Sequence, residues 1–271
     1  MCRGILALFC ILCILLLRVR GLMIAGKVLV SQKVVEFVAA RMAIANCAAH
    51  DINHCFRVAN LSESIARKES GTNVKVAYYG GLLHDVMDHK LYGPEGTEAT
   101  KTELLALLTE DSSLTASDVT TIFEIINNVG YKNMIRPRTD FDPFALSTEY
   151  RCVQDADLLD AIGAIGVARC YAYTGRTNAK MFGGPVVSGA LTVTREQYLL
   201  SQQSKDASAV GHFFEKLLRI KDLIMTEEGK RLAAARHANM VAFLQQLDEE
   251  LIGAGDVSGG VITNTIPHFI V

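Results

Sequence analysis

Apolar positions along most of the chain recur with the period of an α-helix. Between residues 28 and 46 the apolar side chains of Val30, Val34, Phe37 and Val38 fall on one helical stripe. The same spacing predicts further helices over 51–68, 74–88, 97–108, 117–129, 147–173, 208–225 and 227–251. We therefore predict an all-α fold, a single compact helical bundle. Gly163 and Gly166 weaken the long segment 147–173 and suit the close approach of another helix.

Polar and glycine-containing stretches separate these segments. We expect a loop over 92–96, irregular structure over 131–143, and a long loop rich in Gly, Thr and Ser over 174–203. Gly71 suits the end of one helix, and Ser117 suits the cap that begins another. From Gly253 onwards, the composition predicts a flexible C-terminal tail over 253–271.

The first 22 residues form a separate hydrophobic segment. Residues 5–17 are all apolar, and arginines stand on both sides of them. This run is shorter than the roughly 20 residues that a membrane-spanning helix needs. Three interpretations stay open. The segment is a weak membrane anchor, a targeting peptide, or translated upstream sequence, in which case the true translation start is Met23. We therefore assign the folded domain to residues 23–252.

Composition limits the classes of partner and the compartment. The 271 residues carry a net charge of -2, with a pI of about 6.4. Nucleic acid is therefore not an expected partner, and an anionic substrate needs a local cluster of cations. The 7 cysteines are an odd number scattered through the predicted helices, which suggests reduced thiols. We expect a cytoplasmic protein that associates at most weakly with a membrane through residues 5–17. The sequence leaves the oligomeric state open.

Histidines and acids occur at three places in otherwise apolar helical segments. His84 and Asp85 are adjacent at the end of one such segment, and His50 and His54 share a face of another because they are four residues apart. Near residue 157, three acids stand among apolar residues, which is costly unless a cation compensates their charge: Asp155, Asp157 and Asp160. Combining a His, the His-Asp pair and a distant Asp gives a mixed nitrogen and oxygen ligand set. Such a set suits Mn, Fe, Co, Ni or Zn without selecting one of them.

The order of these residues, together with the longer stretches around them, resembles the HD-domain superfamily of metal-dependent phosphohydrolases. The resemblance is closest to its small stand-alone members, the YedJ-type branch. It runs from about residue 50 to 245. The stretches that carry it are HDINHCFRVANLSESIA, GGLLHDVMDHK, IFEIINNVGYKN, VQDADLLDAIGAIGVAR and GHFFEKLLRIKDLIMTEEGKRLAAARHANMVAFL.

The resemblance implies one divalent metal ion. Manganese and Mg are among the candidates, with Fe, Co, Ni and Zn, and the sequence does not determine which ion binds. The resemblance implies four metal ligands, with Asp155 as the alternative to the last of them: His54, His84, Asp85 and Asp157. It also implies catalytic roles for Asp88 and Asp85. Five residues are candidate contacts for a substrate phosphate, of which the resemblance places the first two near the site: Lys90, Lys132, His212, Lys216 and Lys221.

The function implied is hydrolysis of a phosphate ester or anhydride, with a nucleotide as the small phosphorylated substrate and a metal-activated water as the nucleophile. One alternative is a zinc peptidase, because His50 and His54 flank three residues as in H-E-x-x-H, with Asp51 in place of the glutamate. The shorter acid would displace the general base, and this alternative leaves His84, Asp85 and Asp157 unexplained. The other alternative is a helical module that binds nucleotides without turnover.

Overall fold

The computed structural model describes residues 28–45, 52–87, 89–137, 139–183, 195–196, 208–256 and 258–269. Within these ranges the protein is helical, and the extended pairing is limited to one isolated bridge between Lys180 and Ser208. The predicted all-α fold class is therefore confirmed. No helix among the described residues has the length and apolar character that spanning a membrane requires. The N-terminal apolar segment, 5–17, lies outside these ranges.

The helices follow one another in the order in which the apolar periodicity predicts them. They are α2 (Gln32–Ala45), α3 (Ile52–Ala66), α4 (Val74–Leu83), α5 (His89–Glu110), α6 (Ala116–Asn128), α7 (Tyr131–Met134), η1 (Pro143–Ala145), α8 (Thr148–Asp160), α9 (Gly163–Thr177), α11 (Ala209–Glu215), η2 (Leu217–Leu223), α12 (Glu227–Gly253), α13 (Val261–Thr265) and η3 (Ile266–Phe269).

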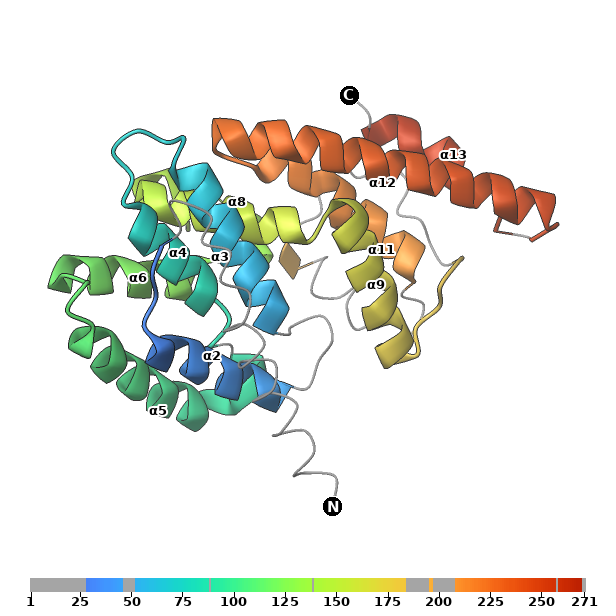
Figure 1. The fold of residues 1–271 in the computed structure, drawn as a ribbon. Coiled ribbons are helices and arrows are strands. Elements are labelled where there is room, and N and C mark those ends of the chain that lie inside the picture. The colour runs from blue at the N-terminus through green and yellow to red at the C-terminus, as the bar shows by residue number, and fades with distance from the viewer. Residues whose placement is uncertain are drawn as a thin grey trace, which may run out of the picture.

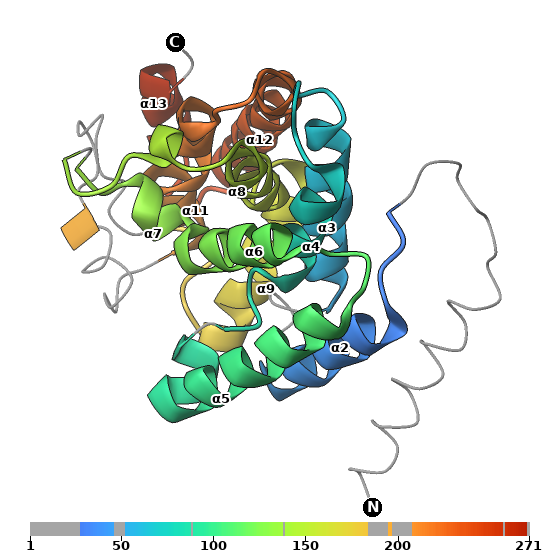
Figure 2. The ribbon, with the colours of Figure 1, turned by 90° about the vertical axis from the view of Figure 1, so that its left-hand side faces the viewer.

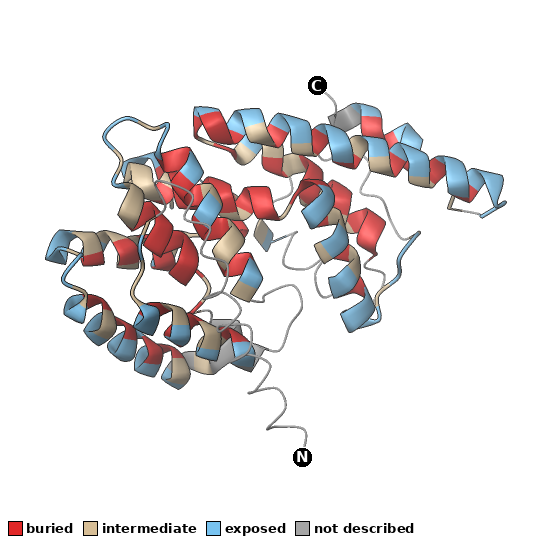
Figure 3. Cartoon of the chain, in the orientation of Figure 1, coloured by how far each residue is buried: buried red, intermediate tan, exposed pale blue. Residues whose placement is uncertain are grey.

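Helices α3, α4 and α8 pack against one another and form the centre of the bundle (Figure 1). The pair α2 and α5 lies at one end of the molecule, and the long helix α12 lies at the other with α9, α11 and α13, as the second view also shows (Figure 2). Buried residues line the inner sides of the helices, whereas the outer sides of α5 and α12 are largely exposed (Figure 3). This is the pattern that a stripe of apolar positions produces in an amphipathic helix.

Several of the sequence predictions about element boundaries differ from the structure. The loop expected over 92–96 lies within α5, where Gly93 with a φ of +68° kinks the helix. The segment 147–173 is two helices, because Gly163 takes a φ of +75° and the chain turns between α8 and α9. At that turn Gly163 lies against the side chain of Arg236 in α12, so this glycine does permit the close packing expected of it. The segment 208–225 is likewise divided into α11 and the 3-10 helix η2. Helix α6 is capped by Thr115 and Asp118 in a capping box, not by Ser117.

The C-terminal residues that composition marked as a flexible tail contain a folded element. Helix α13 packs on α12, and Ile262 and Ile266 are buried. Asp248 of α12 accepts hydrogen bonds from the backbone N–H groups of Gly260 and Thr263, at 2.9 Å each. These two bonds tie the start of α13 to α12. The glycines that suggested flexibility instead allow the turn, since Gly255 and Gly260 both have positive φ.

Candidate metal centre

Two adjacent glycines in α4 allow the central helices to approach closely. A Cβ atom at Gly81 would lie 2.9 Å from the Cα of Ala59 in α3, and one at Gly80 would lie 2.9 Å from Ile125 in α6. Side chains at these positions would therefore separate α4 from its neighbours. The close contact of α3 and α4 places His84, the residue that follows α4, beside His54 of α3.

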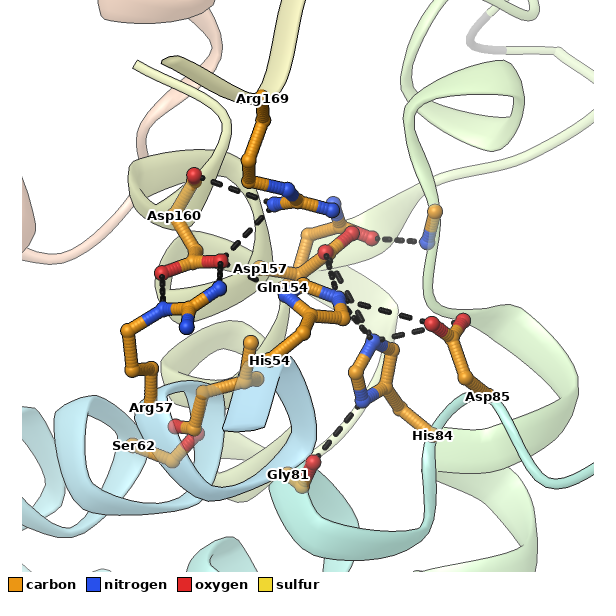
Figure 4. Close-up of polar contacts among 12 residues, drawn as sticks. His54, Arg57, Ser62, Gly81, His84, Asp85, Gln154, Asp157, Asp160 and Arg169 are labelled. Atoms are coloured by element: carbon orange, nitrogen blue, oxygen red, sulfur yellow. Dashed lines mark hydrogen bonds and ion pairs between the residues drawn. The ribbon is translucent and has the colours of Figure 1, made fainter. Parts of the chain in front are cut away.

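Four of the residues singled out in the sequence converge at this contact (Figure 4). The Nε2 atoms of His54 and His84 are 3.2 Å apart. Asp85 lies 3.5 Å from the first of these nitrogens and 3.4 Å from the second. Oδ1 of Asp157, which comes from α8, lies 3.6 Å and 3.7 Å from the same two nitrogens. Three separate parts of the chain thus supply two imidazoles and two carboxylates to one place.

Hydrogen bonds fix which nitrogen of each imidazole faces this cluster. Nδ1 of His84 donates to the carbonyl oxygen of Gly81 at 2.8 Å, and Nδ1 of His54 donates to Oδ2 of Asp160 at 2.7 Å. Neither acceptor can donate in return, so both Nδ1 atoms carry the proton. In the neutral imidazoles both Nε2 lone pairs therefore point toward each other. Only a cation or a proton between them makes that arrangement favourable.

The donor atoms of His54, His84 and Asp85 all lie within 4.8 Å of one another and fit a divalent metal ion, and Asp157 lies beside both histidines. With metal–ligand bonds of about 2.1 Å, neighbouring donor atoms stand about 3.0–3.5 Å apart, close to the separations given above. Two neutral imidazoles and two carboxylates also carry a charge that balances a divalent cation. Without an ion, burial lowers the pKa of His54, but the hydrogen bonds and charges of Asp160 and Asp85 outweigh burial and raise this pKa to about 9. The site therefore favours positive charge between its acids, as a proton or as a metal.

The sequence analysis missed the role of Asp160. Its side chain is fully buried and accepts hydrogen bonds from His54, from Arg57 of α3 and from Arg169 of α9. The histidine and the two arginines hold the pKa of this carboxyl well below its usual range against the opposing effect of burial. The available signal was its position three residues after Asp157, on the same face of an otherwise apolar helix.

Asp155 is engaged elsewhere, which corrects its proposed role as the alternative ligand. It accepts hydrogen bonds from the backbone N–H groups of Met225 and Thr226, at 3.0 Å and 2.7 Å, and from the Thr226 hydroxyl at 2.6 Å. These donors belong to the segment that leads into α12, so the carboxylate fixes α12 against α8. Its hydrogen-bonding capacity is used on the side of α8 away from the histidines.

The predicted phosphate contacts have different environments. Nζ of Lys216, the residue that follows α11, lies 5.0 Å from the centre of the Tyr131 ring. Tyr131 begins α7, the short helix that also carries Lys132, so the end of α11 contacts α7. The start of α7 is tied to the metal-ligand helix, because the Gly130 N–H donates to Oε1 of the buried Gln154 at 2.8 Å. The phosphate-binding roles of Lys132, Lys216 and Lys221 stay predictions.

His212, unlike the lysines proposed with it as phosphate contacts, is uncharged near neutral pH. Burial and the charge of Lys216 lower the pKa of His212 to about 3, so the imidazole is neutral near pH 7. A neutral imidazole can still donate a hydrogen bond to a phosphate oxygen, so the role of His212 as a phosphate contact stays a prediction. Asp88, His50 and the side chain of Lys90 lie outside the described residues, and their predicted roles stay predictions.

Comparison with known proteins identifies the class of this fold and site. The HD domain family matches residues 51–162, a range that contains all four converging residues. The chain is also 31% identical over 204 residues to the uncharacterized protein YpgQ of Bacillus subtilis, covering 75% of this chain and 85% of that one. The chain therefore belongs to the HD-domain superfamily and has YpgQ among its relatives.

Solved structures agree with this placement. A Lactobacillus plantarum protein is 30% identical with a TM-score of 0.62, and the match covers 83% of this chain and 100% of that one. YpgQ in complex with ADP is 28% identical with a TM-score of 0.60, over 81% and 96% of the two chains. An HD-superfamily hydrolase from Bacillus thuringiensis is 29% identical with a TM-score of 0.57, over 81% and 95%.

Proposed function

We propose that this protein is a metal-dependent phosphohydrolase that cleaves a phosphate ester or anhydride of a nucleotide. The observation that carries the proposal is the convergence of His54, His84, Asp85 and Asp157, with contacts of 3.2–3.7 Å around the two Nε2 atoms. The hydrolase among the similar structures supports the reaction class, and the ADP bound to YpgQ supports a nucleotide substrate. Near-complete coverage of the related chains supports a place among the small stand-alone members of the superfamily.

In this proposal His54, His84, Asp85 and Asp157 hold one divalent ion. When bound, such an ion supplies Lewis acidity and lowers the pKa of water. The side chains of Asp85 and Asp157 are 20% and 22% exposed, so the two carboxylates form the side of the centre that solvent and substrate reach. Asp85 is then placed to accept a proton or a hydrogen bond from the attacking water. The histidines are buried and serve as ligands only.

Lysines 132, 216 and 221 are the proposed phosphate contacts. Lys216 lies over the ring of Tyr131, the residue before Lys132, and the Gly130–Gln154 hydrogen bond connects this turn to the helix that carries Asp157. Positive charge on these lysines would offset the charge of a bound polyphosphate. Lys90 and Asp88 keep their predicted roles as a further phosphate contact and a proton donor.

The direct test is a turnover screen of the purified full chain over nucleoside mono-, di- and triphosphates. Each reaction contains Mn, Co, Ni, Zn or Mg, and the products are identified by phosphorus NMR. We expect phosphate or pyrophosphate release that disappears in the His84→Ala plus Asp85→Ala variant and persists in Asp155→Asn. Equal turnover by the double variant would refute the proposal.

The ADP complex of YpgQ also favours a second candidate, a module that binds nucleotides without hydrolysing them. The same screen separates the two functions, since this candidate predicts saturable nucleotide binding with no product under any metal. The peptidase alternative has less support. His54 shares its site with His84, Asp85 and Asp157, and the peptidase chemistry uses none of these three.

A further inference from the structure

We propose that Asp160 is a positioning residue that fixes His54 as an Nε2 ligand, and that Arg57 and Arg169 hold Asp160 in place for this task. This inference rests on the proposed function, because it concerns the same centre. It assigns roles to three residues that do not touch the ion themselves.

The first argument is the geometry around His54. The imidazole is 1% exposed, and its Nδ1 lies 2.7 Å from Oδ2 of Asp160. The ring has one proton when neutral, and this bond keeps that proton on Nδ1. The lone pair of Nε2 therefore faces His84, Asp85 and Asp157. A carboxylate that holds a ligating histidine in this way orients the ring and raises its basicity.

The second argument is that Asp160 is itself held from two directions. Arg57 donates to both carboxylate oxygens, from Nε at 2.7 Å and from the terminal nitrogen at 3.0 Å. Arg57 stands three residues after His54 on α3, so both reach Asp160 from the same face of that helix. A planar bidentate contact of this kind fixes the orientation of the carboxylate as well as its charge.

Arg169 adds a contact from a third helix. One of its terminal nitrogens donates to Oδ2 of Asp160 at 2.8 Å and to the main-chain oxygen of the same residue at 3.1 Å. Asp160 is the last residue of α8, where carbonyl groups lack partners within the helix. Arg169 therefore caps α8 and immobilises the carboxylate at once. Helices α3, α8 and α9 meet at this one buried side chain (Figure 4).

The arrangement has a chemical consequence for the histidine. Two guanidinium groups beside the carboxylate disfavour its protonated form, so Asp160 does not take the Nδ1 proton. The amide of an Asp160→Asn variant can still accept from His54 if its oxygen occupies the Oδ2 position. Its NH₂ group would then face Nε of Arg57, a donor against a donor, and the negative charge would be gone.

The test measures metal affinity directly in the full chain, by calorimetric titration with Mn²⁺. We expect Asp160→Asn to bind Mn²⁺ roughly 10–100-fold more weakly than the wild type. This is the typical loss of metal affinity when a residue that hydrogen-bonds a metal ligand is replaced. Asp155→Asn is the matched control, since Asp155 is equally buried on the same helix but faces α12. It should bind Mn²⁺ like the wild type.

Two further measurements distinguish positioning from a merely structural role. In the metal-free protein, at a pH well above the His54 pKa of about 9 so that the ring is neutral, the ¹⁵N shifts of His54 should report a protonated Nδ1 and a bare Nε2 in the wild type and a mixture of tautomers in Asp160→Asn. In a His54→Ala background, adding Asp160→Asn should leave the Mn²⁺ affinity unchanged, because the effect passes through the imidazole. Should Asp160→Asn fail to fold, Arg57→Gln, at a side chain that is 34% exposed, tests the same contact more mildly.

The outcomes separate this inference from the proposed function. Wild-type Mn²⁺ affinity in Asp160→Asn and in Arg57→Gln, with unchanged His54 tautomers, overturns the inference and leaves the proposed function standing. Absence of metal binding by the wild type itself overturns the proposed function.

Discussion

Asp155 and Asp157 are separated by one residue, and the structure predicts opposite consequences for their removal. Asp155→Ala deprives the backbone N–H groups of Met225 and Thr226, and the Thr226 hydroxyl, of their acceptor. Thr226 is buried and caps α12, so these groups cannot all turn to water. Asp157→Ala removes a partly exposed carboxylate whose described contacts are the two Nε2 atoms.

The expected magnitudes follow from these contacts. A buried donor left without a partner costs about 1–3 kcal/mol, so we expect Asp155→Ala to lower the free energy of unfolding by roughly 3 kcal/mol. Burial raises the pKa of Asp155 to about 6, despite the hydrogen bonds that lower it, so its charged form is not itself strongly stabilised. Asp155→Asn keeps an acceptor and should cost only about 1 kcal/mol. Asp157→Ala should cost less than about 1 kcal/mol in the metal-free protein but weaken metal binding roughly 100-fold or more.

Thermal unfolding with and without Mn²⁺ measures both effects in one assay. A ligand at 100 times its dissociation constant stabilises the folded state by about 2.7 kcal/mol, or roughly 5–10 °C for a domain of this size. We expect Asp155→Ala to melt roughly 6–12 °C lower than the wild type but to keep the rise caused by Mn²⁺. Asp157→Ala should melt near the wild type and lose that rise. The reverse result, a lost rise in Asp155→Ala and a full rise in Asp157→Ala, would refute the assignment of the fourth ligand.

Two further predictions address the packing of α3 and α4 and the behaviour in acid. Gly81→Ala places a Cβ 2.9 Å from the Cα of Ala59, so it should cost about 1–3 kcal/mol on urea unfolding and weaken Mn²⁺ binding by moving His84 from His54. Gly175→Ala, with nothing within 4 Å, is the control and should leave both unchanged. The unfolded chain takes up a proton on His212 below about pH 6.5, but the folded protein does so only near pH 3. Stability should therefore fall by about 1–2 kcal/mol from pH 7 to pH 5, and His212→Asn should remove that part of the loss; an unchanged pH profile in the variant would contradict this.

The fold was predictable from the sequence where packing depends on one face of a helix. The apolar stripes place α2, α3, α6 and α12 within a few residues of their ends, because each of these helices buries a continuous face. The turn between α8 and α9 was not predictable in the same way. Residues 147–173 satisfy a helical period throughout, and the break depends on the left-handed conformation of Gly163 beside Arg236, a contact with a distant helix.

The candidate site was predictable only in part, and the three acids of α8 show why. Successive helical residues are rotated by about 100°, so Asp155 and Asp157 lie about 160° apart while Asp157 and Asp160 lie about 60° apart. Helical geometry alone therefore implies that Asp157 and Asp160 work on one side and Asp155 on the other. It does not say which side meets α3, because that depends on the close approach of helices at Gly80 and Gly81. Once His54 is placed by that approach, its Nε2 and Nδ1 atoms reach toward Asp157 and Asp160 respectively, and the roles of all three acids follow.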